Sequence, residues 1–143
     1  MDISVKSLFI KPSQLSGAGK GLFTRVAIKK GDRIVEYKGK LMLWKVVKPQ
    51  DGYNAYLLRL NKTTALDARP YLKTLGRYAN DAMGVAKIKG IRNNAEYLTY
   101  GMKCFIVATR SIEKGEEILV RYGREFWLLQ KESMKKKLLP GTA

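Results

Sequence analysis

The chain has 143 residues, which fits one compact domain spanning residues 1–143. It contains one cysteine, Cys104, and no histidine, so an internal disulfide, a Cys/His zinc site and a hydrolase with a histidine base are all excluded. The formal net charge of +16 predicts attraction to nucleic acid, an anionic surface or an acidic partner, unless it serves only solubility.

Short apolar runs separated by Gly, Asn and Asp predict a mainly β protein with short helices. In chain order, the predicted strands cover residues 5–10, 21–24, 33–37, 53–60, 65–67, 95–100, 104–109 and 117–120. The run at 104–108 is apolar on both faces, so we expect this strand in the middle of the core. Residues 125–139 form the only strong helical stretch, and the lysines at 135–137 lie either in its last turns or in a solvated tail.

Targeting signals are not evident. No stretch approaches the roughly 18 apolar residues of a membrane span, and the first residues lack the apolar core of a secretory signal. We therefore expect an intracellular protein without a membrane partner. Because histidine is absent and only one cysteine is present, we also expect no metal site.

Three alternating glycines, Gly17, Gly19 and Gly21, allow positive φ angles and close approach of the backbone to a ligand. The segment does not match the phosphate-binding P-loop pattern. It also fails the dinucleotide-binding fingerprint, because Leu22 stands where the third glycine is required. By itself the segment fits an ordinary hairpin loop as well as a ligand-binding loop.

Further short motifs follow in a fixed order. They lie at residues 19–24 (GKGLFT), 28–39 (IKKGDRIVEYKG), 66–68 (LDA), 76–82 (GRYANDA), 93–95 (NNA), 106–118 (IVATRSIEKGEEI) and 121–123 (RYG). This succession resembles the SET domain of protein-lysine methyltransferases over about residues 15–127. The chain departs from the family pattern at Asp81 and Ala82, which replace the His and Ser of N-H-S, and at Ala95, which replaces the Cys of P-N-C.

The resemblance implies a SET-domain fold of small curved β-sheets with a threaded, pseudoknot-like C-terminal segment, an exception to the usual unknotted connections. It implies methyl transfer from S-adenosyl-L-methionine to a lysine side chain of a protein, a histone tail or another Lys-rich protein. With a histone substrate, we expect a nuclear or chromatin-associated protein whose basic surface also contacts nucleosomal DNA.

The resemblance also implies roles for individual residues. Tyr122 is the expected catalytic residue. Tyr56, Tyr97 and Val120 are expected to line the channel for the substrate lysine. The expected cofactor-binding residues are Gly17, Ala18, Gly19, Lys20, Gly21, Asn80, Asp81, Tyr122, Phe126 and Trp127.

The expected chemistry needs no histidine. A lysine amine has an ordinary pKa of about 10.4, and both a nearby sulfonium and a desolvated aromatic channel disfavour its ammonium form. Two other functions remain open. The replacements at Asp81 and Ala82 suggest a SET-like interaction module without activity. The charge and the aromatic residues suggest a small nucleic-acid-binding β protein, although no recognisable RNA-binding motif is present.

Overall fold

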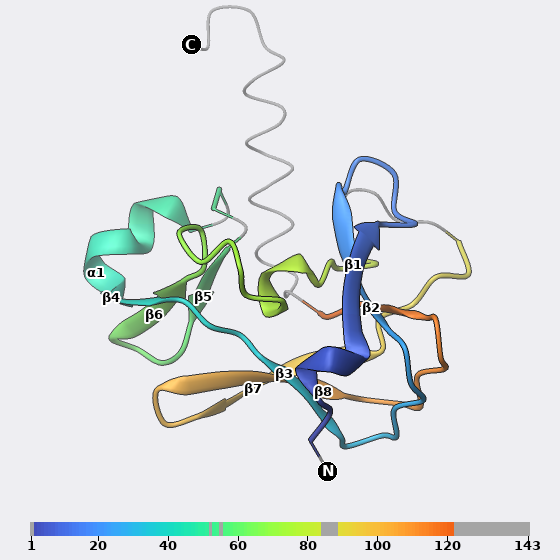
Figure 1. The fold of residues 1–143 in the computed structure, drawn as a ribbon. Coiled ribbons are helices and arrows are strands. Elements are labelled where there is room, and N and C mark those ends of the chain that lie inside the picture. Colours follow the sequence, from blue (N-terminus) through green and yellow to red (C-terminus); the bar gives the residue numbers. More distant parts are fainter. Residues whose placement is uncertain (1, 52, 55, 84–88, 122–143) are drawn as a thin grey trace, which may run out of the picture.

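The computed structural model describes residues 2–51, 53–54, 56–83 and 89–121. In this part of the chain, the strands form three small antiparallel sheets of three strands each (Figure 1). The sheet on the right of Figure 1 has the order β1 (Leu8–Pro12), β2 (Lys20–Thr24) and β9 (Glu117–Ile118). The lower sheet has the order β3 (Arg33–Glu36), β8 (Lys103–Ala108) and β7 (Ala95–Tyr100). The sheet on the left has the order β4 (Lys40–Leu43), β6 (Thr64–Asp67) and β5 (Leu57–Arg59).

The helices of the described residues are all short. They are the 3₁₀ turns η1 (Val5–Ser7), η2 (Lys48–Gln50) and η3 (Gly76–Tyr78) and the α-helix α1 (Trp44–Val47). None of them is long and apolar enough to span a membrane. The mainly β fold predicted from the sequence is confirmed.

The segment after β9 is threaded between two other parts of the chain. On one side, the amide of Val120 donates to the carbonyl of Asn80 at 2.8 Å. On the other side, the amide of Ala95 donates to the carbonyl of Leu119 at 3.0 Å. Leu119 and Val120 therefore run between the two ends of the 80–95 segment, which is the threaded arrangement that we expected.

The main core lies between the sheet of β2 and the sheet of β8. Its fully buried members come from many elements and include Leu22, Ile28, Ile34, Ile106, Ile112 and Ile118. β8 pairs with β3 on one side and with β7 on the other, which confirms the predicted central strand. Burial raises the pKa of the Cys104 thiol in β8 to about 11, so the thiol is protonated and uncharged at neutral pH.

Several predicted boundaries are wrong. The strand predicted at 5–10 begins at Leu8, because Ser4 caps a 3₁₀ turn by accepting a hydrogen bond from the amide of Lys6 at 3.3 Å. The strand predicted at 53–60 is reduced to β5, because the side chain of Asn54 accepts a hydrogen bond from the amide of Tyr56 and forms a turn there. The strand predicted at 117–120 is regular only over β9, and its remainder is the threaded segment.

The strand β4 and the helix α1 were not predicted, nor were the three 3₁₀ turns. Residues 41–47 are apolar except for Lys45 and do not alternate, so no strand pattern is visible, and four residues are too few for a helical period. All four residues of β4 pair with β6, and this pairing defines the strand in the absence of a local sequence pattern. The helix predicted at 125–139 lies outside the described residues.

Candidate active site

The glycine-rich loop connects β1 to β2 and has a backbone suited to a ligand. Gly17 and Gly19 have φ angles of 75° and 70°, a conformation that favours glycine. A Cβ atom added at either position would meet no protein atom within 4 Å. In the part of the chain that the structure describes, the amides of these two glycines donate to no acceptor. Among the described residues, the loop thus has two backbone donors without acceptors, and space for a ligand beside its Cα atoms.

Glu117 in β9 fixes the start of this loop. Its carboxylate accepts hydrogen bonds from the Ser13 hydroxyl at 2.7 Å and from the Gln14 amide at 3.1 Å, and the residue is only 2% exposed. A Cβ at Gly21 would collide with this carboxylate. Gly21 is therefore required by the packing of Glu117, a different reason from the ligand contact that the sequence suggests.

Asn80 joins the loop to the threaded segment. Its side-chain amide donates to the carbonyl of Lys20 at 3.0 Å, and its backbone carbonyl accepts from Val120 at 2.8 Å. Ala18, in the loop, packs on the small cluster of Leu15, Ala82 and Leu119. The structure therefore brings together the predicted cofactor residues of the loop, Asn80 and the threaded segment.

The side chain of Asp81 points into the protein. It is 5% exposed and accepts hydrogen bonds from the Met83 amide and the Asn93 side chain, both at 2.8 Å. The Asn93 side-chain oxygen in turn accepts from the amide of Ala82 at 2.7 Å. The departures from the family pattern at Asp81 and Ala82 are thus accommodated, since Asp81 is hydrogen-bonded and Ala82 is fully buried.

Asn94 holds the threaded segment from the other side and is fully buried. Its side-chain oxygen accepts from the Leu119 amide at 2.9 Å, and its side-chain nitrogen donates to the Glu117 carbonyl at 2.8 Å. Its backbone amide donates to the Leu119 carbonyl at 2.8 Å. Asn94 and Glu117 therefore position the site, and neither was among the site residues predicted from the sequence.

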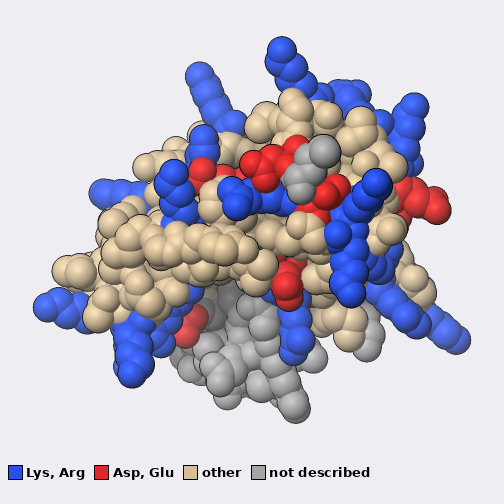
Figure 2. All heavy atoms as spheres, turned by 90° about the horizontal axis from the view of Figure 1, so that it is seen from below, with Lys and Arg blue, Asp and Glu red and all other residues tan. Residues whose placement is uncertain are grey.

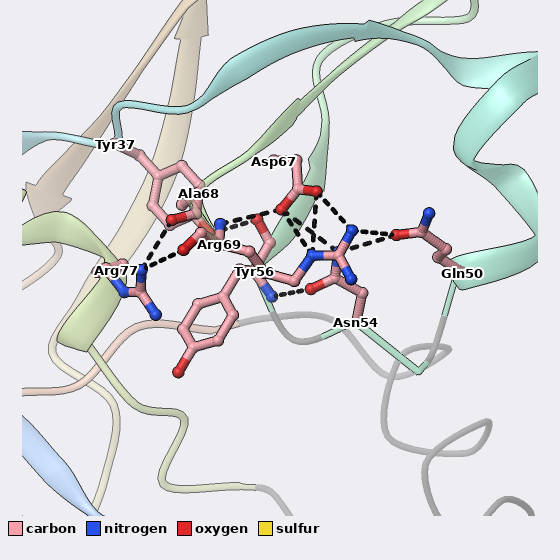
Figure 3. Close-up of polar contacts among 8 residues, drawn as sticks. All are labelled: Tyr37, Gln50, Asn54, Tyr56, Asp67, Ala68, Arg69 and Arg77. Carbon is pink, nitrogen blue, oxygen red and sulfur yellow. Dashed lines mark hydrogen bonds and ion pairs between the residues drawn. The ribbon is translucent and has the colours of Figure 1, made fainter. Parts of the chain in front are cut away.

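Tyr56 belongs to a hydrogen-bonded cluster at the end of β6 (Figure 3). The Tyr37 hydroxyl donates to the Tyr56 carbonyl at 2.7 Å, and the Asn54 side chain accepts from the Tyr56 amide at 3.0 Å. Asp67 forms an ion pair with Arg69 at 2.9 Å. Burial acts to raise the pKa of Asp67, but hydrogen bonds from Arg69 and Asn54 outweigh it and lower that pKa below 3.8.

Arg77 connects this cluster to the segment that leads to Asn80. Its guanidinium carbon lies 4.2 Å from the centroid of the Tyr56 ring. One terminal nitrogen donates to the carbonyls of Ala68 at 2.9 Å and Arg69 at 2.8 Å (Figure 3). Its buried Nε has no hydrogen-bond partner among the residues that the structure describes. A fixed cation therefore lies against one face of a predicted channel residue.

The other two predicted channel residues lie in the same part of the core. Val120 is fully buried in the main core cluster, and Tyr97 packs against that cluster. The Tyr97 ring also meets the Tyr37 ring edge-on, with the ring centroids 5.5 Å apart. Tyr56 and Tyr97 pack against a common second cluster around Tyr37. Tyr97 thus joins the cluster that contains Val120 of the threaded segment to the cluster that Tyr56 packs against.

Three predicted site residues, Tyr122, Phe126 and Trp127, lie outside the described residues. Among the described residues, no three side chains of the kinds that bind metals gather into a site. The sequence does contain signals for Glu117 and Asn94, the two positioning residues that were not predicted. Glu117 is the second glutamate of the GEE motif, and Asn93 and Asn94 form the N-N pair. Only the folded structure shows which bonds they make.

Known proteins share both this sequence pattern and this fold. The SET domain family matches residues 19–123 of the chain. N-lysine methyltransferase KMT5A of Xenopus tropicalis is 30% identical over 127 residues, which cover 80% of this chain and 36% of that protein. Histone-lysine N-methyltransferase set-1 of Caenorhabditis elegans is 30% identical over 115 residues, which cover 73% of this chain and 46% of that protein.

The chain thus spans between about a third and a half of the length of these relatives. Among solved structures, the methyltransferase domain of human PR domain-containing protein 2 has the same fold, with a TM-score of 0.64 and 23% identity. That similarity covers 82% of this chain and 78% of the other. The family match spans more than half of the sequence, and the threaded architecture agrees with it, so the chain belongs to the SET domain family.

Proposed function

We propose that this protein transfers a methyl group from S-adenosylmethionine to the side-chain amine of a lysine in a protein substrate. One observation carries the proposal. The threaded segment directly precedes Tyr122 in the sequence and is hydrogen-bonded to Asn80, which also holds the glycine loop at Lys20. Hydrogen bonds therefore connect the glycine loop, through Asn80, to the threaded segment that leads to the predicted catalytic residue.

The described residues fit the proposed cofactor. Its amino acid end carries an ammonium and a carboxylate, which need backbone acceptors and donors respectively. The free amides of Gly17 and Gly19 are such donors, and the open space beside them leaves room for a ligand. When bound, the cofactor supplies an electrophilic methyl group on a sulfonium. Asn80 and the 17–21 loop are the residues that we expect to hold it.

The chain's own residues then prepare the lysine. Tyr56 and Tyr97 form an apolar wall, where desolvation favours a neutral amine over an ammonium. The Arg77 guanidinium, 4.2 Å from the Tyr56 ring, adds a positive charge that favours the neutral amine further. The Tyr122 hydroxyl would orient the amine so that its lone pair could take up the methyl group that the bound cofactor would supply. Alignment supplies most of the rate enhancement.

A histone or another basic protein is the proposed substrate class. The relative in Caenorhabditis elegans is a histone-lysine methyltransferase by name, and the relatives in Xenopus carry the broader name of N-lysine methyltransferase. With a histone as substrate, this protein acts on chromatin. The proposal extends these activities to a chain that spans less than half of either relative.

The test is to incubate the purified protein with labelled S-adenosylmethionine and, separately, with free histones, nucleosomes and ribosomal proteins. We expect label in lysine-containing peptides and a rise in melting temperature when the cofactor is added, because a ligand of the folded state stabilises it. Tyr122→Phe is expected to bind the cofactor but to lose at least about tenfold in kcat. Absence of a thermal shift at millimolar cofactor contradicts the proposal.

A second candidate function is a SET-like interaction module without turnover. Asp81 favours it, because a buried carboxylate occupies the position of the family histidine. The two candidates differ in one measurement. Cofactor binding without methylation of any substrate supports the interaction module, and incorporation of label that depends on Tyr122 supports the enzyme.

A further inference from the structure

Two basic side chains lie over a pair of stacked rings on the sheet of β1 and β2. Phe9 and Phe23 face each other across the two strands, with ring centroids 5.6 Å apart and ring planes at 25°. The Lys11 ammonium lies 4.4 Å from the Phe23 centroid, and the Arg25 guanidinium lies 4.5 Å from the Phe9 centroid. We name these four residues the β1–β2 patch.

Charge density alone does not single out this patch. Figure 2 shows Lys and Arg projecting around the whole of one face of the molecule, with Asp and Glu mainly toward its middle. A net charge of +16 distributed in this way gives general attraction to polyanions. A preferred contact surface needs cations that are both held in place and unpaired.

The other cations that lie over rings are already engaged. Arg33, over Phe105, forms an ion pair with Asp2 at 3.5 Å. Arg59, over Trp44, donates to two backbone carbonyls, each at 2.9 Å. The Arg77 guanidinium likewise donates to carbonyls.

Lys11 and Arg25 differ from these cations. Within the described chain, neither side chain forms a hydrogen bond or an ion pair. Their donors therefore face solvent, while the rings restrict their motion.

We propose that the β1–β2 patch binds the phosphate backbone of double-stranded nucleic acid. The Lys11 ammonium is also 5.8 Å from the Phe9 centroid, so two like charges lie beside one ring. A phosphate between them relieves their repulsion and accepts charge-assisted hydrogen bonds from both. Because the rings already restrict the side chains, binding costs less side-chain entropy than at a free lysine.

Nucleic acid fits better than a lipid surface. Binding to a bilayer by an aromatic patch requires rings that reach the acyl boundary. Here Phe23 is only 5% exposed and lies under the Lys11 ammonium. This proposal does not depend on methyl transfer, because its readout is binding, so its failure and that of the proposed function are separable.

The test is fluorescence anisotropy with a labelled DNA duplex of about 20 base pairs at salt between about 50 and 200 mM. For the variant Lys11→Gln/Arg25→Gln we expect about tenfold weaker binding at low salt. The slope of log K against log salt should fall by about 2, since each phosphate contact contributes about one unit. The matched control is Lys45→Gln/Lys62→Gln, which removes the same charge from exposed residues on the other side of the molecule (Figure 1).

The control variant should bind the duplex at most about threefold more weakly than wild type, because it removes only diffuse charge. Its slope of log K against log salt should stay the same. Equal losses in the two double variants, or no loss in the patch variant, overturn the proposal. Stronger binding of wild-type protein to phosphatidylserine vesicles or polyglutamate than to the duplex also overturns it. If the patch variant melts early, the single variant Lys11→Gln replaces it, with an expected slope change of about 1.

Discussion

Glu117 illustrates how a single buried carboxylate can shape a loop that is predicted to bind a ligand through its backbone. The loop is expected to bind through its backbone, so its conformation must be fixed by side chains elsewhere. Glu117 does this by holding Ser13 and Gln14 across 104 and 103 positions of sequence. The carboxylate also fills the space beside Gly21, where any side chain would collide with it. A change of charge at Glu117 should therefore alter cofactor affinity.

We predict that Glu117→Gln destabilises the fold by about 1–3 kcal/mol, because the amide cannot accept both hydrogen bonds as a carboxylate does. The loosened loop should raise the Kd for S-adenosylmethionine by about tenfold, equivalent to about 1.4 kcal/mol. Urea unfolding and calorimetric titration measure the two effects. The control is Glu113→Gln, an exposed glutamate in the neighbouring turn. An unchanged Kd in Glu117→Gln would show that the loop does not depend on this anchor.

In the proposed reaction, the number of methyl groups transferred is also expected to depend on single residues. Val120 lies two positions before Tyr122, and its side chain has neither a ring nor a hydroxyl. It therefore leaves room for a methylated amine in the predicted channel, and we predict products with more than one methyl group. Mass spectrometry of a fully reacted substrate measures the outcome. A product that remains monomethylated under excess cofactor contradicts the prediction.

Tyr97→Phe is the control for this prediction, because it removes a hydroxyl and keeps the ring that packs on Tyr37. It should leave the number of methyl groups in the product unchanged. Additional methyl groups in this variant would show that Tyr97 limits the degree of methylation. Val120→Tyr should shift products toward fewer methyls. Since Val120 is fully buried, the larger side chain also costs about 1–3 kcal/mol in overpacking, and its folding must be verified first.

At the scale of elements, the turn before β5 is held by side chains rather than by a strand ladder. Asp67, at the end of β6, accepts from the Arg69 side chain at 2.9 Å and from the Asn54 side chain at 3.4 Å. Asn54 in turn fixes the amide of Tyr56. The predicted channel wall thus depends on a carboxylate whose pKa is lowered by its partners.

We predict that Asp67→Asn loses about 1–2 kcal/mol of stability at neutral pH, because half-exposed Arg69 loses its ionic partner. The folded-state pKa lies below the ordinary 3.8, so the contribution is complete above that value and is lost as pH falls through the folded pKa. Wild type and variant should therefore converge in stability at acidic pH. Urea unfolding between about pH 7 and pH 3 measures this, and a constant difference across that range contradicts it.

A comparison of the predicted and observed elements shows which structural features can be predicted from the sequence. β8 was predictable because its residues are apolar on both faces, and the glycine loop because positive φ angles favour glycine. β4 was missed because only its pairing with β6 defines it. The anchoring roles of Glu117 and Asn94 were missed for a similar reason. Their bonds join segments far apart in sequence, and no local pattern reports such bonds.

For the whole molecule, the distribution of carboxylates limits how a basic substrate can be attracted. Near the candidate site, Asp67, Asp81 and Glu117 are each at most 6% exposed and hydrogen-bonded within the protein. They offer little charge to an incoming lysine-rich tail. Because the protein as a whole carries a net charge of +16, it should repel a free basic peptide.

A nucleosome reverses the sign of this interaction, since its DNA attracts the enzyme while its tails supply lysine. We predict that, at low salt, nucleosomes are methylated at least about tenfold faster than a free peptide of the same tail. Raising the salt from about 50 to about 200 mM should reduce this advantage steeply, because releasing the same counterions into a more concentrated salt solution is less favourable. The peptide rate should rise slightly, because salt screens the repulsion between like charges. Initial rates with labelled cofactor measure both trends.

In the same assay, the variant Lys11→Gln/Arg25→Gln distinguishes DNA binding by the β1–β2 patch from general attraction by the net charge. It should reduce the rate advantage of nucleosomes over free peptide and leave the peptide rate close to that of wild type, because the two substitutions change only exposed side-chain charges and keep the backbone pairing of Lys11 with Gly21. A peptide rate that falls with the nucleosome rate would mean that the patch supports the catalytic fold instead. Equal methylation of peptide and nucleosome by wild-type protein at both salt concentrations would contradict a role for charge in substrate choice.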